Sequence, residues 1–174
     1  MKKIIFALTL TLITSLTILQ AEKLAPAFSL TTIDNKTINI TETKEGLKFK
    51  EFKGKAVLIV LFGHKCPPCL KEIPEFIKLT NKHKDDLAIV ALEAQDYPSD
   101  DVKSFAKEHM MNYNVIAGVN YGDFISYLAK KAGYNSEIPL PLLVSIDKYG
   151  EVQGVQAGRL REDELEFLVK DLNE

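Results

Sequence analysis

The sequence predicts an α/β domain in which helices flank a central mixed β-sheet, and three patterns indicate this class. Unbroken apolar runs at 56–62 and 87–92 have strand length and are typical of strands covered on both faces of a sheet. Amphipathic helical patterns follow each run. A strand at 142–146, a turn at 147–150 and a returning strand at 151–155 form a predicted hairpin. The alternation implies parallel pairing, and the hairpin adds antiparallel strands at one edge.

The chain is expected to begin with a signal peptide, which takes no part in the fold. Two lysines precede an uncharged run at 4–19, and Ala21 is the small residue typical of a cleavage point. The run lies between the length of a signal core and the roughly 18 residues that favour a spanning helix, so an uncleaved N-terminal anchor stays open. We therefore expect a signal segment at 1–21 and one domain at 22–174, exported to the periplasm or an equivalent compartment.

Composition limits the classes of function. The 174 residues are enough for one domain plus the signal segment, and 46% hydrophobic residues are ordinary for a globular protein. The 22 basic and 24 acidic residues are spread along the chain, without the basic clustering of a nucleic-acid-binding surface. We therefore expect no nucleic-acid partner.

Residues 22–56 predict an irregular N-terminal β extension. Apolar side chains alternate around the turn residues 34–36, as in short strands: Phe28, Leu30, Ile38 and Ile40. The charged stretch at 41–53 is expected to be a loop before the first buried strand.

Four helices are expected in the rest of the chain. The first follows Cys69 up to the polar stretch 81–86, with a kink at Pro74 because proline cannot donate to the preceding turn. The second helix starts at Ser99 as its N-cap, and the third ends at Gly133 as its C-cap. A short strand at 113–116 lies between these two helices, which form a helical insert. The last has apolar residues at i, i+3, i+4 and i+7: Leu165, Leu168, Val169 and Leu172.

Cys66 and Cys69 are the candidate redox centre. They are the only cysteines, and their spacing suits a disulfide across the first turn of a helix. A disulfide that closes so short a loop removes little entropy from the unfolded chain and therefore stabilises the fold only slightly. Redox exchange thus explains the pair better than a structural bridge. Residues 63–65 link the buried strand to the helix and place Cys66 at the helix start. There, free backbone N–H groups and the helix dipole favour a thiolate.

The pattern also predicts roles for the neighbouring residues. Cys66, as the exposed N-terminal member, is the expected nucleophile, and Cys69 the resolving thiol. Pro67 and Pro68 occupy the turn where missing N–H donors matter least, and they stiffen the active-site loop. Glu72 shares the helix face of Cys69. If it is partly buried, its pKa rises and it can exchange protons with Cys69; otherwise it is a solvated carboxylate.

Metal sites are weaker interpretations of these residues. A closed zinc site needs four ligands, and the chain has no second cysteine pair, so we expect no metal and no other cofactor. His64, His83 and His109 are scattered and are expected to be ordinary surface or loop histidines. Lys65 either supports the Cys66 thiolate electrostatically or only adds solubility.

Two segments carry a resemblance to a known family. Residues 54–62 followed by 66–74 closely resemble extracytoplasmic thioredoxin-like thiol:disulfide oxidoreductases of the TlpA, ResA and CcmG type. Residues 138–147 with Gly150 are similar to the proline loop and hairpin of the same family. The resemblance extends from about residue 25 to the end, and it implies the thioredoxin fold.

The resemblance also implies roles for individual residues. The Leu140–Pro141 bond is expected to be cis and to face the cysteines, with the backbone of Leu140 pairing with an extended substrate segment. Glu72 matches an acid implicated in proton transfer. The chain departs from the family pattern where Lys65 and Phe62 replace tryptophans, which leaves the choice of substrate and the reduction potential open.

The expected function is that of a disulfide reductase outside the cytoplasm. Members of the family generally reduce apocytochrome c or other oxidised proteins and receive electrons from a membrane thiol carrier. The alternatives are an oxidase or isomerase on the same fold, since potentials of related folds range from roughly −270 to −120 mV, and a copper-binding module that uses both thiolates and a histidine. Thiol peroxidases of this fold lack the C-x-x-C partner, so they fit less well.

Overall fold

The computed structural model of the chain describes residues 25–174. The signal peptide or anchor expected at 1–21 lies outside the described residues. Among the helices of residues 25–174, none has both the length and the apolar character that crossing a bilayer requires.

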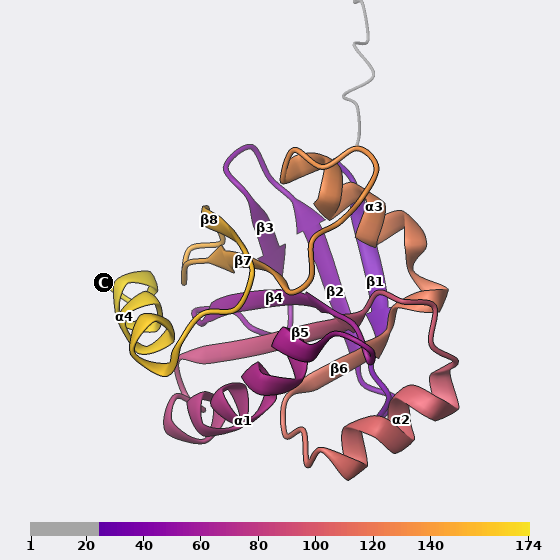
Figure 1. Cartoon of the computed structure of the whole chain (residues 1–174). Coiled ribbons are helices and arrows are strands. Elements are labelled where there is room, and N and C mark those ends of the chain that lie inside the picture. The colour runs from indigo at the N-terminus through magenta and orange to yellow at the C-terminus, as the bar shows by residue number, and fades with distance from the viewer. Residues whose placement is uncertain (1–24) are drawn as a thin grey trace, which may run out of the picture.

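The centre of the fold is a five-stranded mixed sheet with the strand order β6-β5-β4-β7-β8 (Figure 1). β4 (Ala56–Phe62), β5 (Leu87–Glu93) and β6 (Asn114–Ala117) are parallel, whereas β7 (Leu142–Ile146) and β8 (Val152–Ala157) are antiparallel. Every residue of β4 and β5 is buried, because both faces of the sheet are covered. The mixed sheet, its buried strands and the C-terminal hairpin are confirmed.

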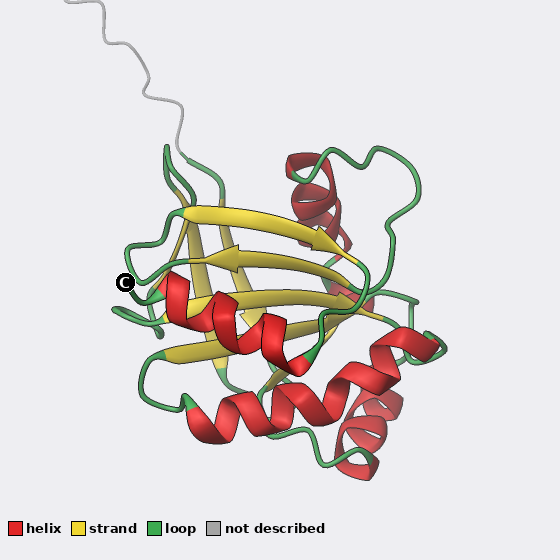
Figure 2. Cartoon of the chain, turned by 60° about the vertical axis from the view of Figure 1, so that its left-hand side comes forward, coloured by secondary structure: helices red, strands yellow, loops and turns green. Residues whose placement is uncertain are grey.

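Helices cover one face of this sheet and a combination of helix and strands covers the other (Figure 2). α1 (Pro67–Lys82), α2 (Ser99–Glu108) and α4 (Glu162–Leu172) pack on the face that receives alternate residues of β4, from Ala56 to Phe62. α3 (Gly122–Lys131) packs on the opposite face. Because side chains alternate along a strand, a single apolar run serves both cores.

A small antiparallel sheet completes the second core. It consists of β1 (Ala27–Thr31), β2 (Thr37–Glu42) and β3 (Leu47–Phe49), and its buried side chains contact the same cluster as α3. The prediction of a loop at 41–53 is wrong in part, since β2 extends into this stretch and β3 lies within it. In β3 only two apolar side chains flank an exposed lysine, and so short an alternation is hidden among charged neighbours.

Two helix boundaries test the expected caps. α2 starts at Ser99, as predicted, but Ser99 does not cap it. Pro98 is the N-cap residue and has no capping side chain, while Ser99 Oγ accepts from Asn120 Nδ2 at 2.9 Å. The C-cap of α3 is Ala132, and Gly133 follows it with a φ of +88°, the left-handed conformation that glycine commonly adopts just after a helix. α1 runs unbroken through Pro74.

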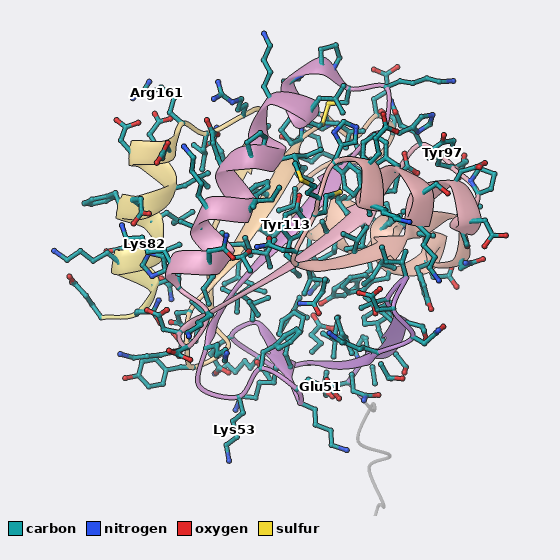
Figure 3. All side chains as sticks on the ribbon, turned by 90° about the horizontal axis from the view of Figure 1, so that it is seen from below. Glu51, Lys53, Lys82, Tyr97, Tyr113 and Arg161 are labelled. Carbon is teal, nitrogen blue, oxygen red and sulfur yellow. A yellow bond between two sulfur atoms is a disulfide. The ribbon has the colours of Figure 1, made fainter. Side chains whose placement is uncertain are left out.

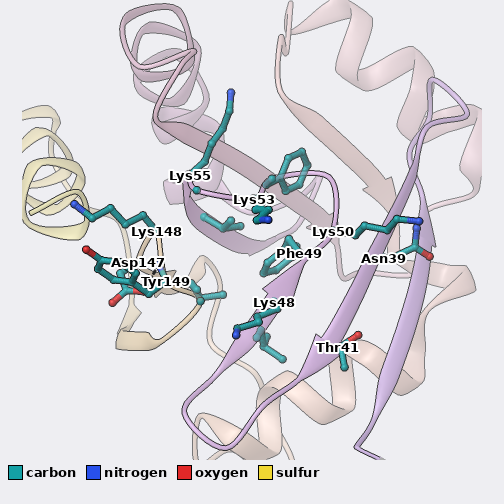
Figure 4. Close-up of a pocket in the computed structure, with 16 residues that line it drawn as sticks. Asn39, Thr41, Lys48, Phe49, Lys50, Lys53, Lys55, Asp147, Lys148 and Tyr149 are labelled. Atoms are coloured by element: carbon teal, nitrogen blue, oxygen red, sulfur yellow. Dashed lines mark hydrogen bonds between the residues drawn. The ribbon is translucent and has the colours of Figure 1, made fainter.

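A cavity of about 660 Å³ lies between the small sheet and the β7–β8 turn (Figure 4). Five lysines line it: Lys48, Lys50, Lys53, Lys55 and Lys148. It adjoins the start of β4, whereas the cysteines follow the end of that strand. Because the two sites lie at opposite ends of β4, the cavity is separate from the redox centre. Two of its ammonium groups already donate to backbone carbonyls, Lys55 Nζ to Lys84 O at 2.6 Å and Lys148 Nζ to Asn173 O at 2.6 Å.

Candidate active site

The redox centre lies where β4 gives way to α1. Cys66 and Cys69 form a disulfide with their Cα atoms 5.2 Å apart. Cys66 is the N-cap of α1, and the backbone N–H of Cys69 donates to Cys66 Sγ at 3.3 Å. The sulfur of Cys66 thus lies at the positive end of the helix, as the sequence predicts.

Cys66 is less accessible than expected. Its exposed fraction is 7%, against 3% for Cys69, so both cysteines are buried in the disulfide form. The reason is packing: both belong to the core cluster beneath α1, and Leu140 packs against that cluster. Cys66 remains the more accessible of the two, but the expectation of an exposed sulfur is wrong for this state.

The two prolines and Lys65 present an exposed rim beside the disulfide. Pro67 and Pro68 are the first two residues of α1, and neither has a backbone N–H. The amide of Cys69 is therefore the first helical donor available to the sulfur of Cys66. Lys65 is exposed, and its backbone N–H donates to Gln95 Oε1 at 2.9 Å.

The proline loop enters the site from the start of β7. The Leu140–Pro141 peptide bond is cis, as the family resemblance implied. Pro141 is buried, and Leu140 is half-buried against the cluster that contains both cysteines. The loop and the redox pair are thus brought together from segments far apart in the sequence.

Glu72 is buried beneath the cysteines and is not a solvated carboxylate. Its exposed fraction is 2%, and its Oε1 accepts from the backbone N–H of Leu160 at 2.9 Å. Burial raises the pKa of the Glu72 carboxyl from 4.5 to about 7. The bond from Leu160 opposes this rise, the negative charge of Glu75 adds to it, and the guanidinium of Arg159 opposes it. A carboxyl with this pKa can take or give a proton near neutral pH.

Glu72 and Cys69 share a small internal cavity. Its volume is about 10 Å³, at the lower limit for a single water molecule, and Tyr113 forms part of its wall (labelled in Figure 3). Burial raises the pKa of the Tyr113 phenol, and the negative charge of Glu72 acts in the same direction. The phenol therefore stays protonated, and Glu72 and Cys69 line one confined space.

A second buried carboxylate, Glu93, lies at the end of β5 and was missed by sequence reasoning. Its side chain is fully buried. Oε1 accepts from the backbone N–H of His64 at 3.2 Å and lies 2.8 Å from His64 Nδ1. Oε2 accepts from the backbone N–H groups of Gln95 at 3.1 Å and Tyr97 at 3.0 Å. The signal that could have found it is an acidic residue directly continuing the apolar run of β5.

The three histidines differ in their surroundings. His64 is a loop residue as expected but not a surface one, because its ring stacks on Tyr97 with centroids 3.8 Å apart and is nearly enclosed. His83 Nε2 pairs with Glu166 at 3.1 Å at the far end of α1, and His109 packs on the ring of Phe105. In the described part of the chain, no three histidine, cysteine or acidic side chains gather in a metal-binding arrangement.

A protein-family model and relatives of similar sequence match most of the chain. The family model described as Redoxin matches residues 20–172. The thiol-disulfide oxidoreductase ResA of Bacillus thuringiensis subsp. konkukian is 34% identical over 150 residues, which cover 85% of this chain and 76% of that protein. The thioredoxin-like protein YneN of Bacillus subtilis is 26% identical over 153 residues, 85% of this chain and 78% of that one.

Solved structures match the fold. A thiol:disulfide interchange protein of the thioredoxin family from Chlorobium tepidum has a TM-score of 0.66 at 24% identity, over 86% of this chain and 95% of that one. StoA from Bacillus subtilis has a TM-score of 0.62 at 19% identity, over 83% and 97%. The expected thioredoxin fold is confirmed. The chain belongs to the Redoxin family and is a thiol-disulfide oxidoreductase.

Proposed function

We propose that the protein is a disulfide reductase that acts outside the cytoplasm. The observation that carries the direction of electron flow is the poor supply of donors around Cys66 Sγ. Because Pro67 and Pro68 lack N–H groups, only the amide of Cys69 reaches this sulfur within the first helical turn. A thiolate with fewer donors is less stabilised, and a less stabilised reduced form gives a lower reduction potential. This favours a reductant over an oxidase.

In the proposed cycle, Cys66 carries out the attack and Cys69 the release. The Cys66 thiolate attacks a disulfide of the substrate, forms a mixed disulfide and frees one substrate thiolate. Cys69 gives its proton to the Glu72 carboxylate and attacks Cys66 Sγ. The second substrate thiolate then leaves, and the Cys66–Cys69 disulfide forms as two electrons pass to the substrate. Glu72 returns its proton to the departing thiolate or to solvent.

The substrate is held by the rim of the disulfide. The cis bond before Pro141 and the packing of Leu140 against the cysteine cluster support pairing of the Leu140 backbone with an extended segment of an oxidised protein. The exposed Lys65 and the two prolines form the other side of this rim. Electrons are resupplied by a membrane thiol carrier, which reduces the Cys66–Cys69 disulfide by the same exchange in reverse.

Export is supported by the signal pattern at 1–21 and by the family resemblance. Apocytochrome c and other exported proteins with a disulfide are the proposed substrates. Expression of Cys69→Ser in the native host tests this, because Cys66 then retains its substrate as a mixed disulfide. Capture of apocytochromes points to cytochrome maturation, capture of many exported proteins to general reduction, and capture of cytoplasmic proteins alone refutes the proposed location.

The direction of electron flow needs a separate measurement. The purified protein is equilibrated with reduced and oxidised glutathione, and the fraction of disulfide is determined. A potential near the roughly −270 mV of reducing members of the fold is expected. A potential near −120 mV refutes the reductase and favours the oxidase alternative.

A further inference from the structure

The redox loop is tied to the end of β5 by acceptors that the reaction itself does not use. Two consecutive amides of the loop donate to this segment, His64 N–H to Glu93 Oε1 at 3.2 Å and Lys65 N–H to Gln95 Oε1 at 2.9 Å. Gly63 lies so close to Gln95 that a Cβ there would be 2.3 Å from its side chain. Of the three residues that precede Cys66, two are therefore hydrogen-bonded to this segment and the third packs closely against it.

Glu93 is the anchor of this arrangement, and His64 is its only side-chain donor among the described residues. A buried carboxylate must be compensated by donors, and Glu93 accepts from three backbone N–H groups. The fourth partner is His64 Nδ1, at 2.8 Å from Oε1. Since a carboxylate oxygen only accepts, the ring nitrogen donates. The ring is fixed from its other side by the stack on Tyr97, 3.8 Å away with an interplanar angle of 8°.

We propose that His64 is a positioning residue of the redox centre, which through Glu93 and Tyr97 sets the reactivity of Cys66. His64 is two residues from Cys66, and its backbone and ring both end on the same carboxylate oxygen. Loss of the ring donor loosens the loop that leads to Cys66 and leaves the buried charge of Glu93 less compensated. Both effects disfavour the Cys66 thiolate. Other ionisable groups near the redox pair are the exposed Lys65, the buried Glu72 of α1 and Tyr113, which lines the same small cavity as Cys69.

The inference rests on the exchange activity of the Cys66–Cys69 pair, and two variants separate its components. His64→Asn keeps a donor at the position of Nδ1 and removes the stacked ring. His64→Phe keeps a ring over Tyr97 and removes the donor. His83→Asn is a matched control, because His83 is also largely buried and paired with a carboxylate, but at the opposite end of α1.

Two measurements give the outcome: the pKa of Cys66, from thiolate absorbance against pH, and the equilibrium with glutathione. In His64→Phe we expect a higher Cys66 pKa and an equilibrium constant shifted at least about threefold toward the disulfide, about 14 mV lower in potential. His64→Asn, which loses only the stack, is expected to shift both readouts in the same direction by less than about twofold. His83→Asn is expected to leave both readouts unchanged, although both variants melt at a lower temperature.

Unchanged Cys66 pKa and potential in His64→Phe overturn the inference, whatever happens to its melting temperature, because a purely structural role changes stability alone. If His64→Phe does not fold, Tyr97→Leu removes only the half-exposed stacking ring and is expected to shift both readouts in the same direction by a smaller factor. No shift there overturns the inference as well. A wild-type protein that fails to exchange with glutathione refutes the enzyme function instead, so the two failures are distinguishable.

Discussion

Replacement of Glu72 by glutamine isolates the consequence of burying an ionisable carboxyl beneath the redox pair. Glutamine has nearly the same shape, and its carbonyl can still accept from the N–H of Leu160. It cannot ionise. The comparison therefore removes the charge while it keeps the contacts around Glu72.

The magnitude follows from the raised pKa. A change from 4.5 in the unfolded chain to about 7 in the folded protein corresponds to about 3 kcal/mol. Because the folded state binds the proton more tightly, this stability is fully present below pH 4.5 and is lost as the pH rises through 7. Wild type therefore loses up to about 3 kcal/mol of unfolding free energy from this group between pH 4.5 and pH 8, whereas the glutamine variant does not.

Urea unfolding of the oxidised proteins at several pH values measures the difference. We expect Glu72→Gln to be more stable than wild type at pH 8 and nearly equal to it at pH 4.5. Glu166→Gln is the control of opposite sign, because hydrogen bonding to Lys82 lowers the pKa of Glu166 and the variant loses stability at neutral pH. A stability difference between Glu72→Gln and wild type that does not vary with pH would refute the assignment of a raised pKa.

The same variant tests proton transfer in the reaction. In wild type, resolution of a mixed disulfide by Cys69 is expected to accelerate as the pH rises through about 7, where Glu72 becomes a carboxylate. Stopped-flow measurement of the second exchange step gives this profile. In Glu72→Gln the inflection near pH 7 should disappear and the step should slow. Retention of the inflection would assign it to a different group.

Three further substitutions test other parts of the structure. Pro68→Ala adds an N–H donor in the first turn of α1. This substitution should lower the Cys66 pKa and raise the reduction potential by up to about 30 mV, equal to about 1.4 kcal/mol. An unchanged potential in the glutathione assay would contradict the proposal that the shortage of N–H donors makes the protein a reductant. Glu93→Gln puts an NH₂ group where the carboxylate accepts from backbone amides. The free energy of unfolding in urea should therefore fall by about 1–3 kcal/mol. No measurable loss would show that water enters the site freely. Gly118→Ala should lower the melting temperature, since its Cβ would be 2.0 Å from the Glu93 carbonyl oxygen. The control Gly122→Ala has open space around the new Cβ and should leave the melting temperature unchanged or raise it. Equal effects of the two substitutions would contradict the close packing at Gly118.

The sequence carried those features of the fold that rest on local patterns. The runs of β4 and β5, the C-terminal hairpin and the stripe of α4 each lie within a short stretch, so the spacing of apolar residues was enough to predict them. β3 was not predicted, because three residues among charged neighbours are too few to show an alternation of apolar and polar side chains. The redox pair and its place at a helix start were likewise readable from neighbouring residues alone.

The environment of the redox pair was decided by the tertiary structure. Glu72 is on α1, but the N–H that it accepts belongs to Leu160, 88 residues further along the chain, and the proline loop arrives from the start of β7. His64 and Glu93 are 29 residues apart and meet because β4 and β5 are parallel neighbours that end at the same edge of the sheet. The sequence alone predicted which atoms carry out the exchange. Only the fold determined which buried charges surround them, because burial and pairing depend on segments that meet in space without any local pattern.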